Sequence, residues 1–73
     1  EQRRLYEALY ALDEKRRVVT ILYYFDDLPV KEIACTLGVT EGTVKSRLFS
    51  ARRHLRQALT AKEGKPKEAA TNG

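Results

Sequence analysis

The side chains of this sequence that could recognise another molecule are concentrated in the run TVKSRLFSARRHL, from Thr43 to Leu55. If this run is a helix, its apolar face consists of Val44, Leu48, Ala51 and Leu55. The outer side combines hydroxyl groups, basic groups and one aromatic ring: Thr43, Lys45, Ser46, Phe49, Ser50 and Arg53, with Arg47 and Arg52 on the flanks. Basic groups can donate to guanine edges or phosphates, hydroxyls can pair with several bases, and an apolar ring can contact a thymine methyl group. This combination is typical of a helix that enters the major groove of duplex DNA.

Phe49 is the residue of this run whose position is least expected on a solvent-exposed polar surface. It points away from the apolar side, among Lys45, Ser46 and Arg53. A single exposed phenylalanine is common in proteins, and this one could instead pack on the tail or on a neighbouring domain. Its place nine residues after Thr40, which is well suited to cap the helix, favours contact with DNA.

The residues before this helix, LGVTEGT, predict a helix-turn-helix. Gly38 suits the left-handed conformation that ends a helix, Val39 can return to the core, and Thr40 can accept a backbone N–H at the next helix start. Only about three residues separate a helix over about 29–37 from one over about 41–59. So short a connection containing glycine forces the two helices to cross sharply.

Two further helices are predicted upstream of this motif. The first carries Leu5, Leu9 and Leu12 on one face. Asp13 can cap a second helix over about 14–25, in which we predict an inward stripe of Val18, Ile21, Leu22 and Phe25. The predicted fold class is therefore all-α, a four-helix domain over residues 1–60 that ends in a helix-turn-helix. Residues 61–73 lack periodicity and predict a disordered tail.

The second helix is more apolar than a small surface helix needs to be. Val19, Tyr23 and Tyr24 fall outside its predicted inward stripe, so apolar side chains cover more than half of its circumference. This excess indicates a second contact surface.

Composition and charge narrow the classes of function. The net charge of +4 is uneven, because residues 40–59 carry five basic residues against Glu41 alone. That favours a polyanion partner, although such runs also occur on solvated faces. Cys35 and His54 are the only cysteine and histidine, which excludes an internal disulfide and a closed zinc site. With neither a catalytic Ser/His/Asp or Cys/His set nor a glycine-rich phosphate loop, we predict no enzyme and no cofactor.

The sequence also carries expectations about its context. It has no apolar run long enough for a membrane span or a signal peptide, so we expect no membrane insertion and a cytoplasmic location. It begins with Glu1 rather than methionine, and we expect it to be part of a longer protein.

The run LPVKEIACTLGVTEGTVKSRLFSARRHLR, from Leu28 to Arg56, resembles the C-terminal domain 4 of bacterial sigma factors of the extracytoplasmic-function type. The segments EIA, LGV and GTVKSRLFSAR carry the resemblance, and LDEKRRVVTILYYFDDL upstream extends it to about residues 5–60. It implies a subunit that lends promoter specificity to RNA polymerase. This domain would bind the minus-35 element as duplex DNA, and a preceding domain would read the minus-10 element.

Roles for individual residues follow from the resemblance. The base-facing positions would be Lys45, Ser46, Phe49 and Ser50. Phosphates would be held mainly by Arg47, Arg52 and Arg53, with Thr40 and Thr43 at the helix start. The sequence departs from the family at two positions: Ser50 stands where arginine or histidine is frequent, and Pro29 where serine or threonine usually begins the preceding helix.

The resemblance also implies two protein partners, the flap of the polymerase beta subunit and an anti-sigma factor. The residues we expect at such a partner surface are Tyr6, Tyr10, Val19, Tyr23 and Tyr24. Two alternatives remain. A response-regulator domain of the LuxR type shares the KEIA and TVK segments but usually continues with a histidine, whereas Ser46 and Arg47 follow here. A helical protein-interaction module would instead use the basic helix to bind an acidic protein surface.

Overall fold

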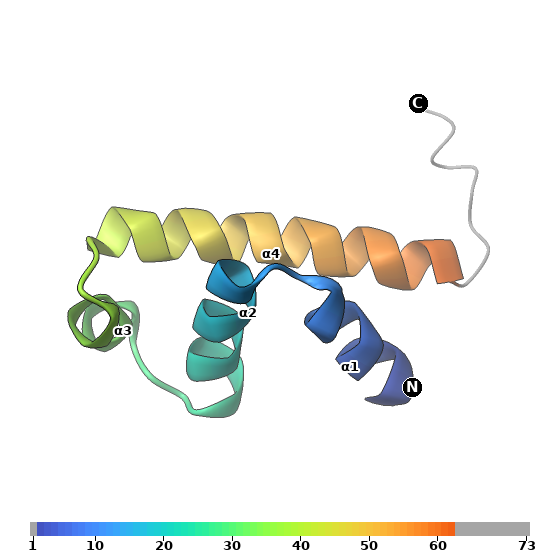
Figure 1. Ribbon diagram of the computed structural model, residues 1–73, viewed down its shortest axis with the longest axis horizontal. Coiled ribbons are helices and arrows are strands. Elements are labelled where there is room, and N and C mark those ends of the chain that lie inside the picture. The colour runs from blue at the N-terminus through green and yellow to red at the C-terminus, as the bar shows by residue number, and fades with distance from the viewer. Residues whose placement is uncertain (1, 63–73) are drawn as a thin grey trace.

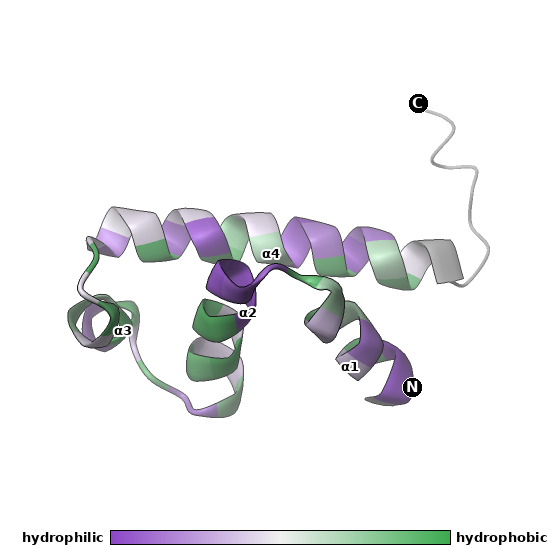
Figure 2. Ribbon diagram, in the orientation of Figure 1, coloured by the Kyte–Doolittle hydropathy of each residue, from purple (hydrophilic) through white to green (hydrophobic). Residues whose placement is uncertain are grey.

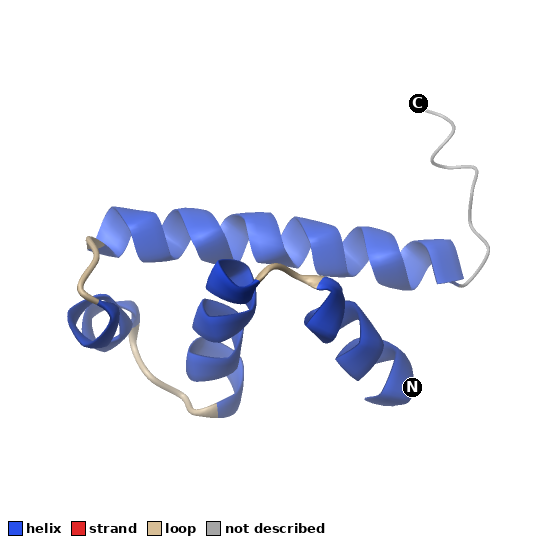
Figure 3. Cartoon of the chain, viewed as in Figure 1, coloured by secondary structure: helices blue, strands red, loops and turns tan. Residues whose placement is uncertain are grey.

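The computed structural model describes residues 2–62, which form four α-helices and one short π-helix (Figure 1). The helices are α1 (Gln2–Ala11), α2 (Glu14–Thr20), α3 (Val30–Leu37) and α4 (Glu41–Lys62), and the π-helix η1 (Ile21–Phe25) continues α2. These residues contain helices and loops and no strand, which confirms the prediction of an all-α domain (Figure 3).

The long helix α4 is the element against which the other helices pack. It lies along one side of the molecule, with α3 near its beginning, α2 near its middle and α1 beside its later half (Figure 1). Its apolar residues recur at helical spacing and face these three helices, while its other sides are more polar (Figure 2). The side of α4 that faces away from the three helices is therefore available to another molecule.

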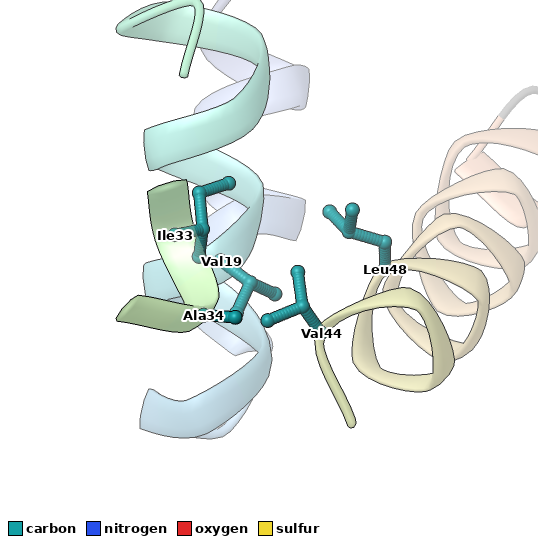
Figure 4. Close-up of a cluster of buried hydrophobic side chains, with 5 residues drawn as sticks. All are labelled: Val19, Ile33, Ala34, Val44 and Leu48. Carbon is teal, nitrogen blue, oxygen red and sulfur yellow. The ribbon is translucent and has the colours of Figure 1, made fainter. Parts of the chain in front are cut away.

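Two clusters of buried side chains hold this arrangement together. The first joins α2, α3 and the first half of α4, and consists of Val19, Ile33, Ala34, Val44 and Leu48 (Figure 4). The second joins α1 to the middle of α4 through Leu9, Leu12 and Ala51. Burying an aliphatic side chain of this size contributes about 1.5–3 kcal/mol, so two small clusters can stabilise a short chain.

The connection between α3 and α4 has the geometry that the sequence predicts. Gly38 ends α3 with φ 71° and ψ 34°, in the left-handed region. The N–H of Val39 donates to the carbonyl of Ala34 (3.0 Å), and the N–H of Gly38 donates to the carbonyl of Cys35 (3.3 Å). This pair of bonds is the Schellman arrangement, which satisfies carbonyls at a helix end. Val39 packs against the first cluster as expected.

The predicted faces of the second helix are partly wrong. We expected Val19 on a partner surface, but it is fully buried against α3 and α4. We expected Phe25 in the inward stripe, but it is 47% exposed. The π-helix explains the second error, because its wider turn, closed by the bond from the Asp26 N–H to the Ile21 carbonyl (3.1 Å), rotates later side chains out of a 3.6-residue register. The first arises because α2 crosses beneath α4 and presents Val19 to it.

The ends of the elements differ slightly from the predictions. Pro29 caps α3 in an extended conformation rather than opening it, and α4 continues to Lys62. The predicted tail falls mostly on residues 63–73, outside the described residues, so its disorder stays a prediction. Within residues 2–62, none of the helices has the length and apolarity that would be needed to cross a membrane.

The opposite faces of α4 predict opposite costs of mutation. Leu48 is 3% exposed and Phe49 is 59% exposed. Leu48→Ala should lower the free energy of unfolding by about 2–5 kcal/mol, because it leaves a cavity in the first cluster. Phe49→Ala should cost less than about 1 kcal/mol, as expected for an exposed position. Chemical denaturation of both variants measures the difference, and equal costs would show that the faces are assigned wrongly.

Candidate nucleic-acid interface

The outer face of α4 is formed by residues that do not pack against α1, α2 or α3. Lys45, Ser46, Phe49 and Arg53 are all exposed. Thr43, Arg47 and Ser50 are half-buried along one flank of this face. The structure thus brings most of the predicted base-facing residues to one side of the helix, close to its beginning. We call Lys45, Ser46, Phe49 and Arg53 the outer face of α4.

The start of α4 is fixed by two threonines. The Thr43 N–H donates to the Thr40 hydroxyl oxygen (3.1 Å), and the Thr40 hydroxyl donates to that of Thr43 (3.0 Å). The predicted cap at Thr40 is therefore confirmed, and it orients Thr43. A Cβ placed on Gly42 would meet only the Thr40 hydroxyl, at 3.8 Å, which is an ordinary contact. Internal packing thus leaves space at Gly42, where a duplex backbone could approach closely.

Arg52 lies apart from the other predicted DNA-contacting residues. Its guanidinium donates to the phenol oxygen of Tyr24 in η1 (2.7 Å), so it points along the side of α4 that faces η1. Arg52 therefore occupies the border between the outer face of α4 and the aromatic surface of η1.

Ser50 has a partner that the sequence does not predict. The Nε–H of Arg16, in α2, donates to the Ser50 hydroxyl oxygen (2.7 Å). Arg16 also forms a salt bridge with Asp13, which precedes α2. We did not predict Arg16 as a site residue, because it lies 34 residues before Ser50 and no local pattern connects the two positions. The hydrogen bond between the serine in α4 and the arginine in α2 depends on how the two helices pack, so only the structure reveals it.

The pKa of Asp13 reflects this contact. The hydrogen bond from Arg16 and the charge of its guanidinium lower the pKa of the Asp13 carboxyl below its usual value of 3.8. The salt bridge is exposed to solvent, so it orients the Arg16 side chain more than it stabilises the fold.

The predicted protein-partner residues, apart from Val19, are at the surface. Tyr6, Tyr10, Tyr23 and Tyr24 are all exposed. The rings of Tyr23 and Tyr24 meet edge to face, with centroids 4.9 Å apart. The Arg17 guanidinium lies over the Tyr10 ring, 5.6 Å from its centroid, and so already occupies one face of that ring.

A groove runs between α1, η1 and α4. It has a volume of about 440 Å³. Its walls are mainly apolar, and two arginines of α4 lie among them: Leu5, Leu9, Thr20, Tyr24, Phe25, Leu55, Arg52 and Arg56. Tyr6 approaches the groove through Phe25, with ring centroids 6.3 Å apart. Tyr24 and Phe25 thus line one apolar depression, and Tyr6 lies next to Phe25. We call this depression the α1–α4 groove.

The family described as Sigma-70, region 4 matches residues 2–55, which include the helix-turn-helix and the outer face of α4. The chain belongs to this family. The match confirms the predicted domain of an extracytoplasmic-function sigma factor, and it favours that prediction over a LuxR-type response regulator.

Individual relatives agree with the family assignment. The RNA polymerase sigma-E factor of Streptomyces coelicolor is 37% identical over 59 residues, which are 81% of this chain and 33% of that protein. The RNA polymerase sigma factor SigV of Bacillus subtilis is 39% identical over 59 residues, 81% of this chain and 36% of that protein. The ECF RNA polymerase sigma factor SigW of Bacillus subtilis is 38% identical over 53 residues, 73% of this chain and 28% of that protein. The chain thus spans about a third of the length of these relatives.

The salt bridge between Arg16 and Asp13 predicts a measurable titration. In an NMR titration, the Asp13 carboxyl should have its midpoint below 3.8, and Arg16→Gln should move the midpoint back up. Because the pKa of Asp13 is lower in the folded state than in the unfolded state, its ionised carboxylate stabilises the folded protein at pH values above the unfolded-state pKa. This contribution to the free energy of unfolding is lost as the pH falls through the folded-state pKa. Lys15→Gln removes a neighbouring charge as a control. A midpoint that ignores the Arg16 substitution would show that the contact does not form in solution.

Proposed function

We propose that this chain is the promoter-recognition module of an alternative sigma factor and binds the minus-35 element as duplex DNA. The observation that carries this proposal is the outer face of α4. A phenylalanine, a lysine, a serine and an arginine are exposed together on a helix whose opposite face is entirely used by the core. A helix presented in this way suits the major groove, where hydrogen bonds and apolar contacts to base edges carry sequence information.

The proposal divides the contacts into two kinds. Lys45, Ser46 and Phe49 lie in the first turns of α4 and would contact base edges. Ser50 lies beside them with its hydroxyl directed to Arg16. Phosphates on either side of the DNA major groove would be held by residues around the outer face of α4 and by the capped start of the helix: Arg47, Arg52, Arg53, Thr40 and Thr43. This division is the usual one, in which phosphate contacts set the orientation and base contacts set the specificity.

A second part of the proposal concerns protein partners. The α1–α4 groove is large and mostly apolar, which suits an amphipathic segment of a protein rather than nucleic acid. We assign it to RNA polymerase, because the relatives are named as RNA polymerase sigma factors. Within the polymerase we assign it to the flap of the beta subunit, which is the contact that the resemblance to sigma domain 4 implies. An anti-sigma factor that covered this groove would compete with the polymerase. The protein would act in the cytoplasm as a binding protein and not as an enzyme.

Phosphate contact by Arg53 predicts a change in salt dependence. With the complete protein and core RNA polymerase, Arg53→Ala should weaken binding to all duplexes and reduce the slope of log K against log salt by about 0.9, the value for one lost phosphate contact. Arg3→Ala is the matched control, since it removes an equal charge from an exposed position of α1, outside the outer face of α4. An unchanged slope for Arg53→Ala would contradict phosphate contact.

Base contact by the outer face predicts a change in promoter choice. Selection from randomised duplexes by the complete protein and core polymerase should yield one preferred minus-35 sequence. Phe49→Ala and Lys45→Ala should each lower discrimination against substituted sites by about 1–3 kcal/mol, if each side chain contacts a base edge. If both variants kept the promoter choice and lost binding to a protein partner, the interaction-module alternative would be correct.

A further inference from the structure

We propose that Arg16 of α2 is an additional DNA-binding residue, which holds a backbone phosphate at the flank of α4 and is positioned there by Ser50. This inference rests on the proposed function, because it assumes that the outer face of α4 binds duplex DNA. It adds to that face a residue from a different helix, outside the helix-turn-helix.

The packing of α2 beneath α4 places Arg16 at the margin of the outer face. The first turn of α2 lies next to the middle of α4 (Figure 1). There the Nε–H of Arg16 donates to the Ser50 hydroxyl oxygen at 2.7 Å. Ser50 directly follows Phe49 and lies one helical turn after Ser46, two residues of the candidate base-contacting set. The guanidinium is therefore held beside residues that would face the duplex.

The guanidinium keeps donors available in this position. Its side chain is 38% exposed, so solvent, and hence a ligand, can reach it. A guanidinium carries five N–H donors, and the bonds to Ser50 and Asp13 use two. Its planar fork suits the oxygens of a phosphate, and prior orientation reduces the entropy lost on binding.

The short side chain of Ser50 is what makes this arrangement possible. A longer residue at position 50 would fill the space that the Arg16 guanidinium occupies against α4. Serine instead leaves this space and supplies an acceptor. The positive charge beside position 50 thus comes from α2, while the recognition helix contributes at this position only the hydroxyl group that orients it.

The location favours a phosphate over a base as the ligand. The side chains proposed to contact bases, Lys45, Ser46 and Phe49, are exposed on the outer face, whereas Ser50 is half-buried on its flank. Arg16 also approaches from a second helix beside α4. If α4 lay in the major groove of DNA, the phosphate backbone that borders that groove would lie on this side. Asp13 balances the charge in the free protein, and a phosphate would take its place as the partner of the guanidinium.

The test compares Arg16→Gln with Lys15→Gln, which removes an equal charge from the neighbouring position of α2. Glutamine can still donate to Ser50, so the packing is preserved. Binding is measured with the complete protein and core polymerase, on the selected minus-35 duplex and on a random-sequence duplex, over a series of salt concentrations. Arg16→Gln should reduce the salt slope by about 0.9 on both duplexes, and Lys15→Gln should not. Equal slopes for the two variants and the unsubstituted protein, or equal reductions in both variants, would overturn the proposal.

Two further variants address the roles of Ser50 and Asp13. Ser50→Ala keeps all charges, so it should weaken binding about twofold to fivefold without changing the salt slope, as expected when the Arg16 side chain has to be ordered on binding. Asp13→Asn frees the guanidinium and should strengthen binding, and this gain should disappear in the Arg16→Gln background. A gain that persisted there would be a general charge effect and would contradict a specific exchange of partners.

The outcomes separate this inference from the function on which it rests. If Arg53→Ala and Phe49→Ala alter DNA binding as proposed while Arg16→Gln does not, only the role of Arg16 fails. If none of these variants affects binding to DNA, the proposed function fails with it. Thermal unfolding of each variant verifies that it is folded at the temperature of the binding measurements.

Discussion

The packing of three short helices against one face of α4 is the constraint on which the rest of the structure depends. Val44, Leu48 and Ala51 are almost completely buried, and they are the points at which α1, α2 and α3 meet the long helix. A chain of 73 residues has few such points, because small domains bury a smaller fraction of their surface. The inner face of α4 is thus fully committed to the fold, and its function must reside on the remaining sides.

These remaining sides differ in their chemistry. The outer face carries exposed basic, hydroxyl and aromatic groups, and the side toward η1 borders an apolar groove. One helix can therefore contact a polyanion on one side and a protein segment on another without a change in the core. The buried first cluster supports this arrangement, since it fixes the position of α4 and therefore the points from which its exposed side chains extend.

Local patterns in the sequence predict the parts of the fold that depend on local interactions. The Gly38 end of α3, the Thr40 cap and the two faces of α4 follow from spacing and from the preferences of single residues. The exposure of Phe25 does not, because the π-helix changes the helical register. The burial of Val19 does not either, because it depends on how α2 crosses α4. The contact between Arg16 and Ser50 also escapes such patterns, since it depends on how two helices distant in sequence pack.

The hydrogen bond from Arg52 to the Tyr24 phenol links the two sides of the molecule to which we assign binding functions under the proposal. Tyr24 lines the α1–α4 groove, and Arg52 is a candidate phosphate contact. A protein partner that displaced the Tyr24 ring would release the Arg52 guanidinium, and DNA that drew Arg52 away would in turn loosen Tyr24. Thermodynamic reciprocity requires that such an effect act equally in both directions. If both proposed sites are used, a single bond between side chains would thereby make the affinity of the domain for one partner depend on the presence of the other.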